Sequence, residues 1–140
     1  MEEFVQFIST LLASRQQAHI FHWQVQGIGS DAAHRALGVY YDEIVDLADG
    51  LVESFQGKYG IQRGYTSPAT FKEDGQFVNY FEALAMYVET IRTKIPQDSY
   101  IQNEVDTVVK LIQTTKYKLI NLKYWKRQKV LAVANAAMFT

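Results

Sequence analysis

The residues best suited to chemistry lie in one short stretch, between positions 19 and 53. All histidines of the chain fall within it: His19, His22 and His34. Six carboxylates fall there too: Asp31, Asp42, Glu43, Asp46, Asp49 and Glu53. Cysteine is absent, so thiolate ligands are excluded. Imidazole nitrogens with carboxylate oxygens suit iron and related divalent metals. The stretch therefore indicates non-haem iron redox chemistry, with other divalent metals as alternatives.

One histidine and four carboxylates share a face of the helix expected to carry them. At about 100° per residue they form a stripe about 120° wide. Its members are His34, Asp42, Asp46, Asp49 and Glu53. Such a stripe is either a solvated acidic face or a surface that meets a metal. His22 lies on the apolar face of the preceding helix, where it is either a hydrogen-bonded core residue or a ligand.

The second half of the chain lacks matching ligands. A bundle with its own di-iron site draws a Glu and a Glu-x-x-His from each half of the chain. Here no histidine follows His34, and no Glu-x-x-His occurs later. A site within one chain is therefore disfavoured. A two-fold axis that sets the stripes of two chains face to face would complete it.

The elements that must position these residues are helices, because apolar residues recur at steps of three and four almost throughout. We expect helices at about 2–26, 30–56, 75–95 and 99–122. Ser30 or Asp31 is the expected cap of the second helix, and Asp98 or Ser99 that of the fourth. Gly57 and Gly60 are expected to stop the second helix.

The connection over residues 59–74 is long for a compact domain. At about 3.3 Å per residue it reaches about 50 Å, whereas a 26-residue helix is about 40 Å long. The connection can therefore run the length of a bundle. This predicts an all-α, ferritin-like four-helix bundle with a long crossover between helices two and three. The alternative is an up-down-up-down bundle with a loose central loop.

Composition indicates a single globular domain over residues 1–140, with a basic and apolar C-terminal extension from about residue 123. The chain is 48% hydrophobic and 21% charged. Its longest apolar run is too short to span a bilayer. The acidic N-terminus opens no secretory pattern, and the lack of cysteine fits a reducing compartment. We therefore expect a cytoplasmic protein that does not associate with membranes.

The net charge of −1 hides a basic C-terminal end. Six bases and no acid follow residue 115: Lys116, Lys118, Lys123, Lys126, Arg127 and Lys129. Such cations can neutralise DNA phosphates, and many copies in an oligomer would add their contacts. Alternatively, they complement a helix C-terminus and solvate its surface. The net acidic charge argues against strong DNA binding.

Three motifs together resemble a known family. They are His-Trp-Gln-Val-Gln-Gly at residues 22–27, a second histidine twelve residues after His22, and the pair Asp49 and Glu53. This pattern resembles the miniferritins, the DNA-binding proteins from starved cells (Dps). Short Dps-like sequences carried by bacteriophages are also similar. The motifs cover about residues 10–57.

The resemblance implies a homo-oligomeric shell, usually of twelve subunits built from two-fold dimers. Such shells oxidise Fe²⁺, preferentially with hydrogen peroxide, and store Fe³⁺ mineral inside. By the resemblance, His22 and His34 from one subunit, with Asp49 and Glu53 from its partner, would be the metal ligands and the catalytic residues. Trp23 and Asp46 would support the ligands from outside, and His19 would lie at the surface or an interface.

One position departs from the family pattern. The family usually has an aspartate four residues after its second histidine, where this chain has Gly38. Glycine inside a helix costs about 1 kcal/mol relative to alanine, so we expect it to admit a close approach of the partner helix or another ligand. Asp42, one turn further on, is the candidate substitute ligand. The alternative is a degenerate site in a DNA-binding or structural oligomer.

Overall fold

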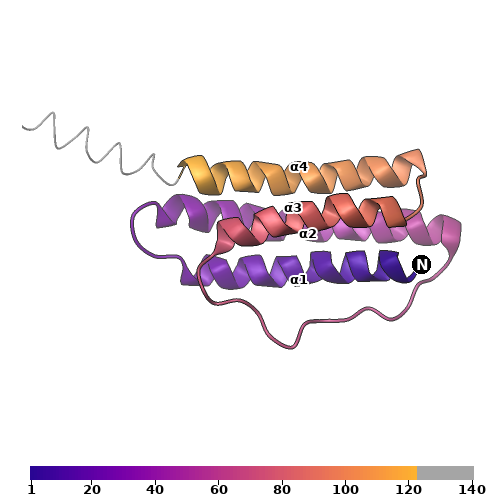
Figure 1. The fold of residues 1–140 in the computed structure, drawn as a ribbon, viewed down its shortest axis with the longest axis horizontal. Coiled ribbons are helices and arrows are strands. Elements are labelled where there is room, and N and C mark those ends of the chain that lie inside the picture. Colours follow the sequence, from indigo (N-terminus) through magenta and orange to yellow (C-terminus); the bar gives the residue numbers. More distant parts are fainter. Residues whose placement is uncertain (123–140) are drawn as a thin grey trace, which may run out of the picture.

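The computed structural model describes residues 1–122, and within them the chain is a bundle of four helices (Figure 1). They are α1 (Glu2–Gln24), α2 (Ser30–Tyr59), α3 (Phe77–Ile91) and α4 (Ser99–Asn121). A 3₁₀ turn, η1 (Arg92–Lys94), follows α3 directly. No strand occurs in the described residues, so the prediction of an all-α chain is confirmed for them. The expected extension from residue 123 lies outside the described part.

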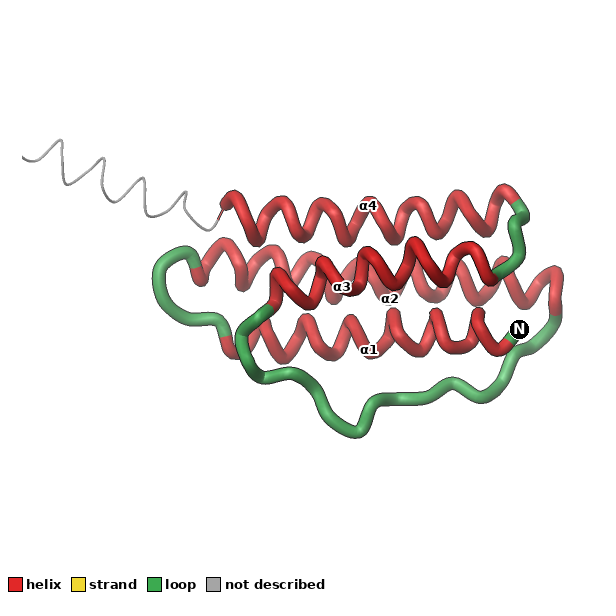
Figure 2. Tube along the Cα trace, in the orientation of Figure 1, coloured by secondary structure: helices red, strands yellow, loops and turns green. Residues whose placement is uncertain are grey.

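The helices form two antiparallel hairpins joined by one long connection. Short links join α1 to α2 and α3 to α4, whereas residues 60–76 run along the outside of the bundle (Figure 2). Helix α3 therefore starts at the opposite end of the bundle from the end of α2, and these two helices point the same way. The connection crosses the bundle from end to end, as its length predicted.

Polar residues on α1 fasten this crossover. Gln17 is 3% exposed, and its side-chain amide donates to the Lys72 carbonyl at 2.8 Å while its Oε1 accepts the Lys72 N–H at 2.7 Å. The Ser9 hydroxyl accepts the Thr66 N–H at 3.0 Å. Buried polar groups need such partners, so these side chains fix where the crossover lies on α1.

The core between the helices combines aliphatic side chains with a smaller set of aromatic rings. Phe4 of α1 stacks on Phe55 of α2, with ring centroids 3.7 Å apart. Tyr40 packs edge-on against Phe81 of α3, and its hydroxyl lies 2.6 Å from that of Ser14. Burial raises the pKa of Tyr40, so its hydroxyl stays neutral and acts as a hydrogen-bonding group. These contacts fix the register of α1 against α2.

Helix α2 starts at residue 30 as predicted, but its cap differs from the prediction and it ends three residues later than residue 56. Its N-cap is Gly29, in a left-handed conformation with φ 83°, and no side chain caps the helix. Ser30 is already helical, and its N–H donates to the Gly27 carbonyl at 3.2 Å. Gly57 lies inside the helix, which ends at Gly60, with φ 87°. Gly60 can leave the helix with a positive φ because glycine has no Cβ.

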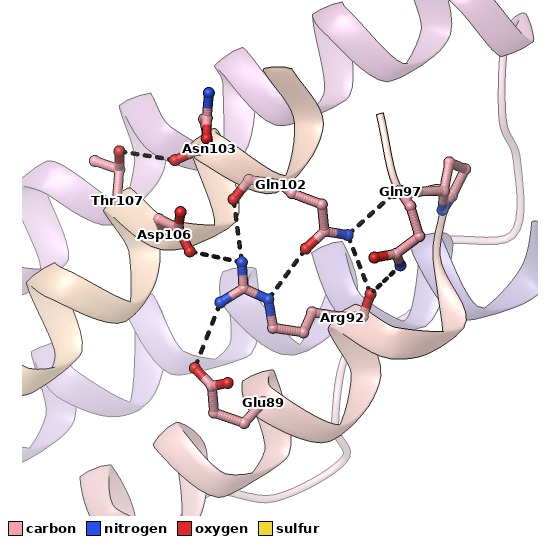
Figure 3. A network of polar contacts seen from close by, with 8 residues as sticks. Glu89, Arg92, Gln97, Gln102, Asn103, Asp106 and Thr107 are labelled. Atoms are coloured by element: carbon pink, nitrogen blue, oxygen red, sulfur yellow. Dashed lines mark hydrogen bonds and ion pairs between the residues drawn. The ribbon is translucent and has the colours of Figure 1, made fainter. Parts of the chain in front are cut away.

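The turn between α3 and α4 is built around Arg92 (Figure 3). Helix α3 ends at Ile91, before residue 95, where its end was predicted. The Arg92 guanidinium contacts Asp106 at 2.6 Å and Glu89 at 3.5 Å. Its Nε donates to the Gln102 side chain at 3.0 Å, and the Gln102 amide donates to the Arg92 carbonyl at 3.1 Å. The planar fork of arginine suits this multiple contact, which joins the two helices of the second hairpin.

Asp98 is the N-cap residue of α4, as predicted, but its side chain makes no capping hydrogen bond. Its carboxylate accepts hydrogen bonds from the Lys58 ammonium and from the Tyr59 hydroxyl at the end of α2. The hydrogen bond from Lys58, followed by that from Tyr59, holds the pKa of Asp98 below its usual value. The Asp98 carboxylate therefore binds Lys58 and Tyr59 of α2 and not the free N–H groups at the start of α4.

This contact predicts a loss of stability in acid. Because the folded state lowers the pKa of Asp98, the contact stabilises the fold above the ordinary aspartate pKa of about 3.9 and is lost as pH falls through the lower folded value. We expect Asp98→Asn to melt below wild type at neutral pH, with the difference shrinking below about pH 4. Circular dichroism melts across pH measure it. Glu82→Gln, on exposed α3 surface, is the control. A difference that is constant with pH would contradict the prediction.

Candidate metal-binding site

Two of the predicted ligands, His22 and His34, meet in the folded chain. His22 lies in the last turn of α1 and His34 in the second turn of α2. The link of residues 25–29 turns the chain so that these two turns lie side by side. The imidazole rings stack with centroids 3.5 Å apart and planes 21° from parallel. The structure thus brings both nitrogen ligands of the prediction to one place.

Each histidine is hydrogen-bonded to the backbone of the other. The Nδ1 of His22 lies 2.6 Å from the His34 carbonyl oxygen, and the Nδ1 of His34 lies 2.9 Å from the His22 carbonyl oxygen. A carbonyl oxygen can only accept, so both Nδ1 atoms carry the proton. In a neutral ring, Nε2 then keeps its lone pair. Metal-binding histidines commonly donate their other ring nitrogen to a carbonyl in this way.

Gly38 lies directly against the His22 ring. A Cβ built at position 38 would lie 3.4 Å from the Cε1 atom of His22 and 3.6 Å from its Nδ1. The sequence led us to expect that Gly38 admits a partner helix or a further ligand. In the structure, the group beside it is an imidazole from the same chain.

Sequence reasoning missed an aromatic cluster beside the histidine pair. The His19 ring lies 4.3 Å from the Tyr41 ring and 4.2 Å from the Trp23 ring, measured between centroids. Tyr41 also packs edge-on against His22 at 5.3 Å. Trp23 is 64% exposed and rests on His19. Tyr41 follows His34 by seven residues, or about two turns, and this spacing was the available signal.

The predicted carboxylates lie elsewhere on α2. Asp49 and Glu53 line a surface hollow of about 370 Å³ whose floor includes Ile8 and Leu12 of α1. Leu12 is 42% exposed. The other two acidic residues of the stripe, Asp42 and Asp46, are also exposed. None of these four carboxylates has a hydrogen bond or an ion pair within residues 1–122.

The nitrogen ligands and the carboxylates do not meet within one chain. Fifteen residues separate His34 from Asp49, which is about 22 Å along a helix. Accordingly, in the described part of the chain, no three His, Asp or Glu side chains converge on a point that could hold a metal. The described part of the chain therefore has two separate groups of candidate ligands, a histidine pair and a carboxylate pair, and both lie where α1 and α2 meet.

Two of the six predicted DNA-binding cations lie within the described residues. Lys116 and Lys118 lie in the last turns of α4 and are half-buried, with the exposed Tyr117 between them. The other proposed DNA-binding residues lie outside the described residues: Lys123, Lys126, Arg127 and Lys129. Within residues 1–122, no helix combines the length and the apolar character needed to cross a membrane.

Comparison with known proteins identifies a family. Residues 22–119, more than half of the chain, match the model of a family of unknown function, DUF5856. The chain belongs to this family. The DUF5856 match begins at His22 and includes His34, Asp49 and Glu53, together with all or part of each helix. No curated protein and no solved structure matches the chain.

Proposed function

We propose that this DUF5856 protein is a Dps-like miniferritin with a ferritin-like bundle. It oxidises Fe²⁺ at sites shared between two chains and stores the ferric product inside a homo-oligomeric shell, of twelve subunits by the resemblance. The observation that carries the proposal is the pair of hydrogen bonds between the Nδ1 atoms and carbonyls of His22 and His34. They leave two neighbouring Nε2 lone pairs for a metal.

A two-fold axis would complete the site from the ligand groups of two chains. The histidine pair and the carboxylate pair both lie where α1 and α2 meet, about 22 Å apart along α2. An axis midway between them, perpendicular to the helix, would set the histidines of each chain against Asp49 and Glu53 of the other. Each dimer then has two equivalent sites. The exposed Leu12 beside the carboxylates provides apolar surface for this contact.

Arg15 supports the same arrangement. It precedes His22 by seven residues and therefore lies on the same side of α1. Its Nε is buried and has no hydrogen-bond partner in the described part of the chain. A buried donor without a partner is costly. If the Arg15 side chain rearranges on association, its guanidinium would meet an acidic surface from a second chain, such as that around Asp42 and Asp46.

The chemistry requires oxygen and nitrogen donors that tolerate both oxidation states of the substrate iron. Two Fe²⁺ ions each give up one electron, and one hydrogen peroxide takes up both electrons and two protons to form two waters. Carboxylates favour the higher charge of the Fe³⁺ product, and neutral imidazoles suit iron in either state. Asp49 and Glu53 have no competing protein partner among residues 1–122, so they remain available to the metal.

Anaerobic addition of Fe²⁺ to the purified protein, followed by peroxide, tests the proposal. We expect rapid growth of ferric absorbance, with iron retained by the protein. Loss of a group that merely supports a ligand costs 10–100-fold, so His22→Ala with Asp49→Ala should slow oxidation by more than about 10-fold. Glu82→Ala, an exposed carboxylate on α3, is the control. Wild-type oxidation no faster than in the double variant would end the ferroxidase proposal and favour a non-catalytic DNA-binding or structural oligomer.

A further inference from the structure

The side chain at position 38 has little room to grow. Gly38 is the ninth residue of a 30-residue helix, and the His22 ring lies against it. Gly57, in the same helix, has open space around a built Cβ, with no atom within 4 Å. At Gly38 the built Cβ meets the His22 ring at 3.4 Å. The two glycines share a helix and differ in what lies beside them.

We infer that Gly38 is a positioning residue that allows the His22 imidazole to reach the backbone of α2. The His34 carbonyl already accepts the N–H of residue 38 as part of the helix. The same oxygen has a second lone pair. A hydrogen-bond donor that approaches this lone pair passes the place where a Cβ of residue 38 would lie. With hydrogen in that place, the Nδ1 of His22 approaches the His34 oxygen to 2.6 Å.

The contact distances set a limit on the size of the side chain. A methyl group at position 38 would touch the ring at 3.4 Å, the near limit of ordinary van der Waals contact. The γ carbons of a valine would add bulk beside the space that the ring occupies. We therefore expect alanine to be tolerated and valine to displace His22 from the His34 carbonyl. The stacked pair would then lose one of its two hydrogen bonds and the fixed proton position on His22.

This inference rests on the proposed function for its consequence, because the Nε2 atoms that it keeps free are those proposed to bind iron. The histidine arrangement itself needs no iron and can be measured without it. Solid-state ¹⁵N NMR of the sedimented, iron-free full-length protein, labelled at histidine, reports which ring nitrogen carries the proton. The measurement is made at about pH 8, where imidazoles are mostly neutral. A His19→Gln sample removes the signals of the third histidine.

The expected spectrum has Nδ1–H signals for both His22 and His34 in wild type, in Gly38→Ala and in the matched control Gly57→Val. In Gly38→Val, His22 should instead show a large Nε2–H population. Valine is a better helix former than glycine, so any loss at position 38 comes from the contact with the ring. Fe²⁺ oxidation should fall at least about 10-fold in Gly38→Val and stay unchanged in Gly57→Val.

Two results would overturn the inference: an unchanged His22 signal in Gly38→Val, or an Nε2–H signal for His22 in wild type. The second needs no variant, so the test stands even if Gly38→Val does not fold. The two proposals fail separately. Intact Nδ1–H signals without Fe²⁺ oxidation would exclude the ferroxidase alone, whereas oxidation without these signals would exclude the role of Gly38 alone.

Discussion

Two inactive variants, coexpressed, are expected to restore part of the Fe²⁺ oxidation that neither supports alone. One chain carries His22→Ala and His34→Ala, and the other carries Asp49→Ala and Glu53→Ala. Each chain keeps one intact ligand group, and in a mixed dimer one of the two sites receives both intact groups. Random pairing makes half of the dimers mixed, so about a quarter of all sites are intact. The rate per chain should approach this fraction of wild type.

Distinct affinity tags on the two chains allow assemblies that contain both to be isolated before the assay. A mixture of two differently tagged copies of the histidine-deficient chain is the control, and it should stay inactive. The result separates a shared site from a site within one chain, because complementation is impossible when all ligands must come from the same chain. Verified mixed assemblies without activity would exclude the two-chain site.

Removal of the Phe55 ring should cause a large loss of stability. Phe55 is wholly buried and stacks on Phe4 at one end of the bundle, with its other neighbour Tyr59 at 4.9 Å. Truncation of a buried phenylalanine to alanine costs about 3–5 kcal/mol, a large part of the stability of an ordinary domain. Urea denaturation of Phe55→Ala at fixed protein concentration measures the cost.

Met86→Ala is the control for this experiment, because Met86 is 74% exposed on α3. Its effect should stay within about 0.5 kcal/mol, as for most surface substitutions. Equal unfolding midpoints for Phe55→Ala and wild type would contradict the packing described for the end of the bundle.

The helices and their buried faces could be predicted from the sequence because they depend on local periodicity. Phe4 and Leu11 in α1, and Leu37 and Ile44 in α2, are each seven residues apart, and all four are buried. The crossover could be predicted from its length alone. Helix periodicity and crossover length both depend on the number of residues within one segment, and this number can be read from the sequence.

The helix ends were predicted less well because their signals compete with tertiary contacts. Asp98 has the side chain of a cap, yet Lys58 and Tyr59 bind its carboxylate. Gly57 resembles a stop signal but lies inside the helix, whereas Gly60, the second predicted stop, does end it. A sequence does not show which partner a side chain finds across the bundle.

The candidate site was predictable as a set of residues but not as a geometry. The sequence predicted His22, His34, Asp49 and Glu53 as ligands of a site shared by two chains, and the structure brings the two histidines together. The ring of His22 against Gly38 depends on the register of α1 against α2, to within a fraction of a turn. Core contacts such as that of Ser14 with Tyr40 set this register, and the spacing of the ligands does not encode it.

The local nature of the histidine pair has a consequence for biosynthesis. His22 and His34 are twelve residues apart, and every contact described between them lies within the α1–α2 hairpin. Chains emerge from the ribosome N-terminus first and bury local contacts before distant ones. The two helices that carry the pair are therefore synthesised before α3 and α4 exist to cover their apolar faces. In the proposed site, the histidine pair would thus belong to the earliest part of the chain to fold, whereas the carboxylates would be added only when a second chain binds.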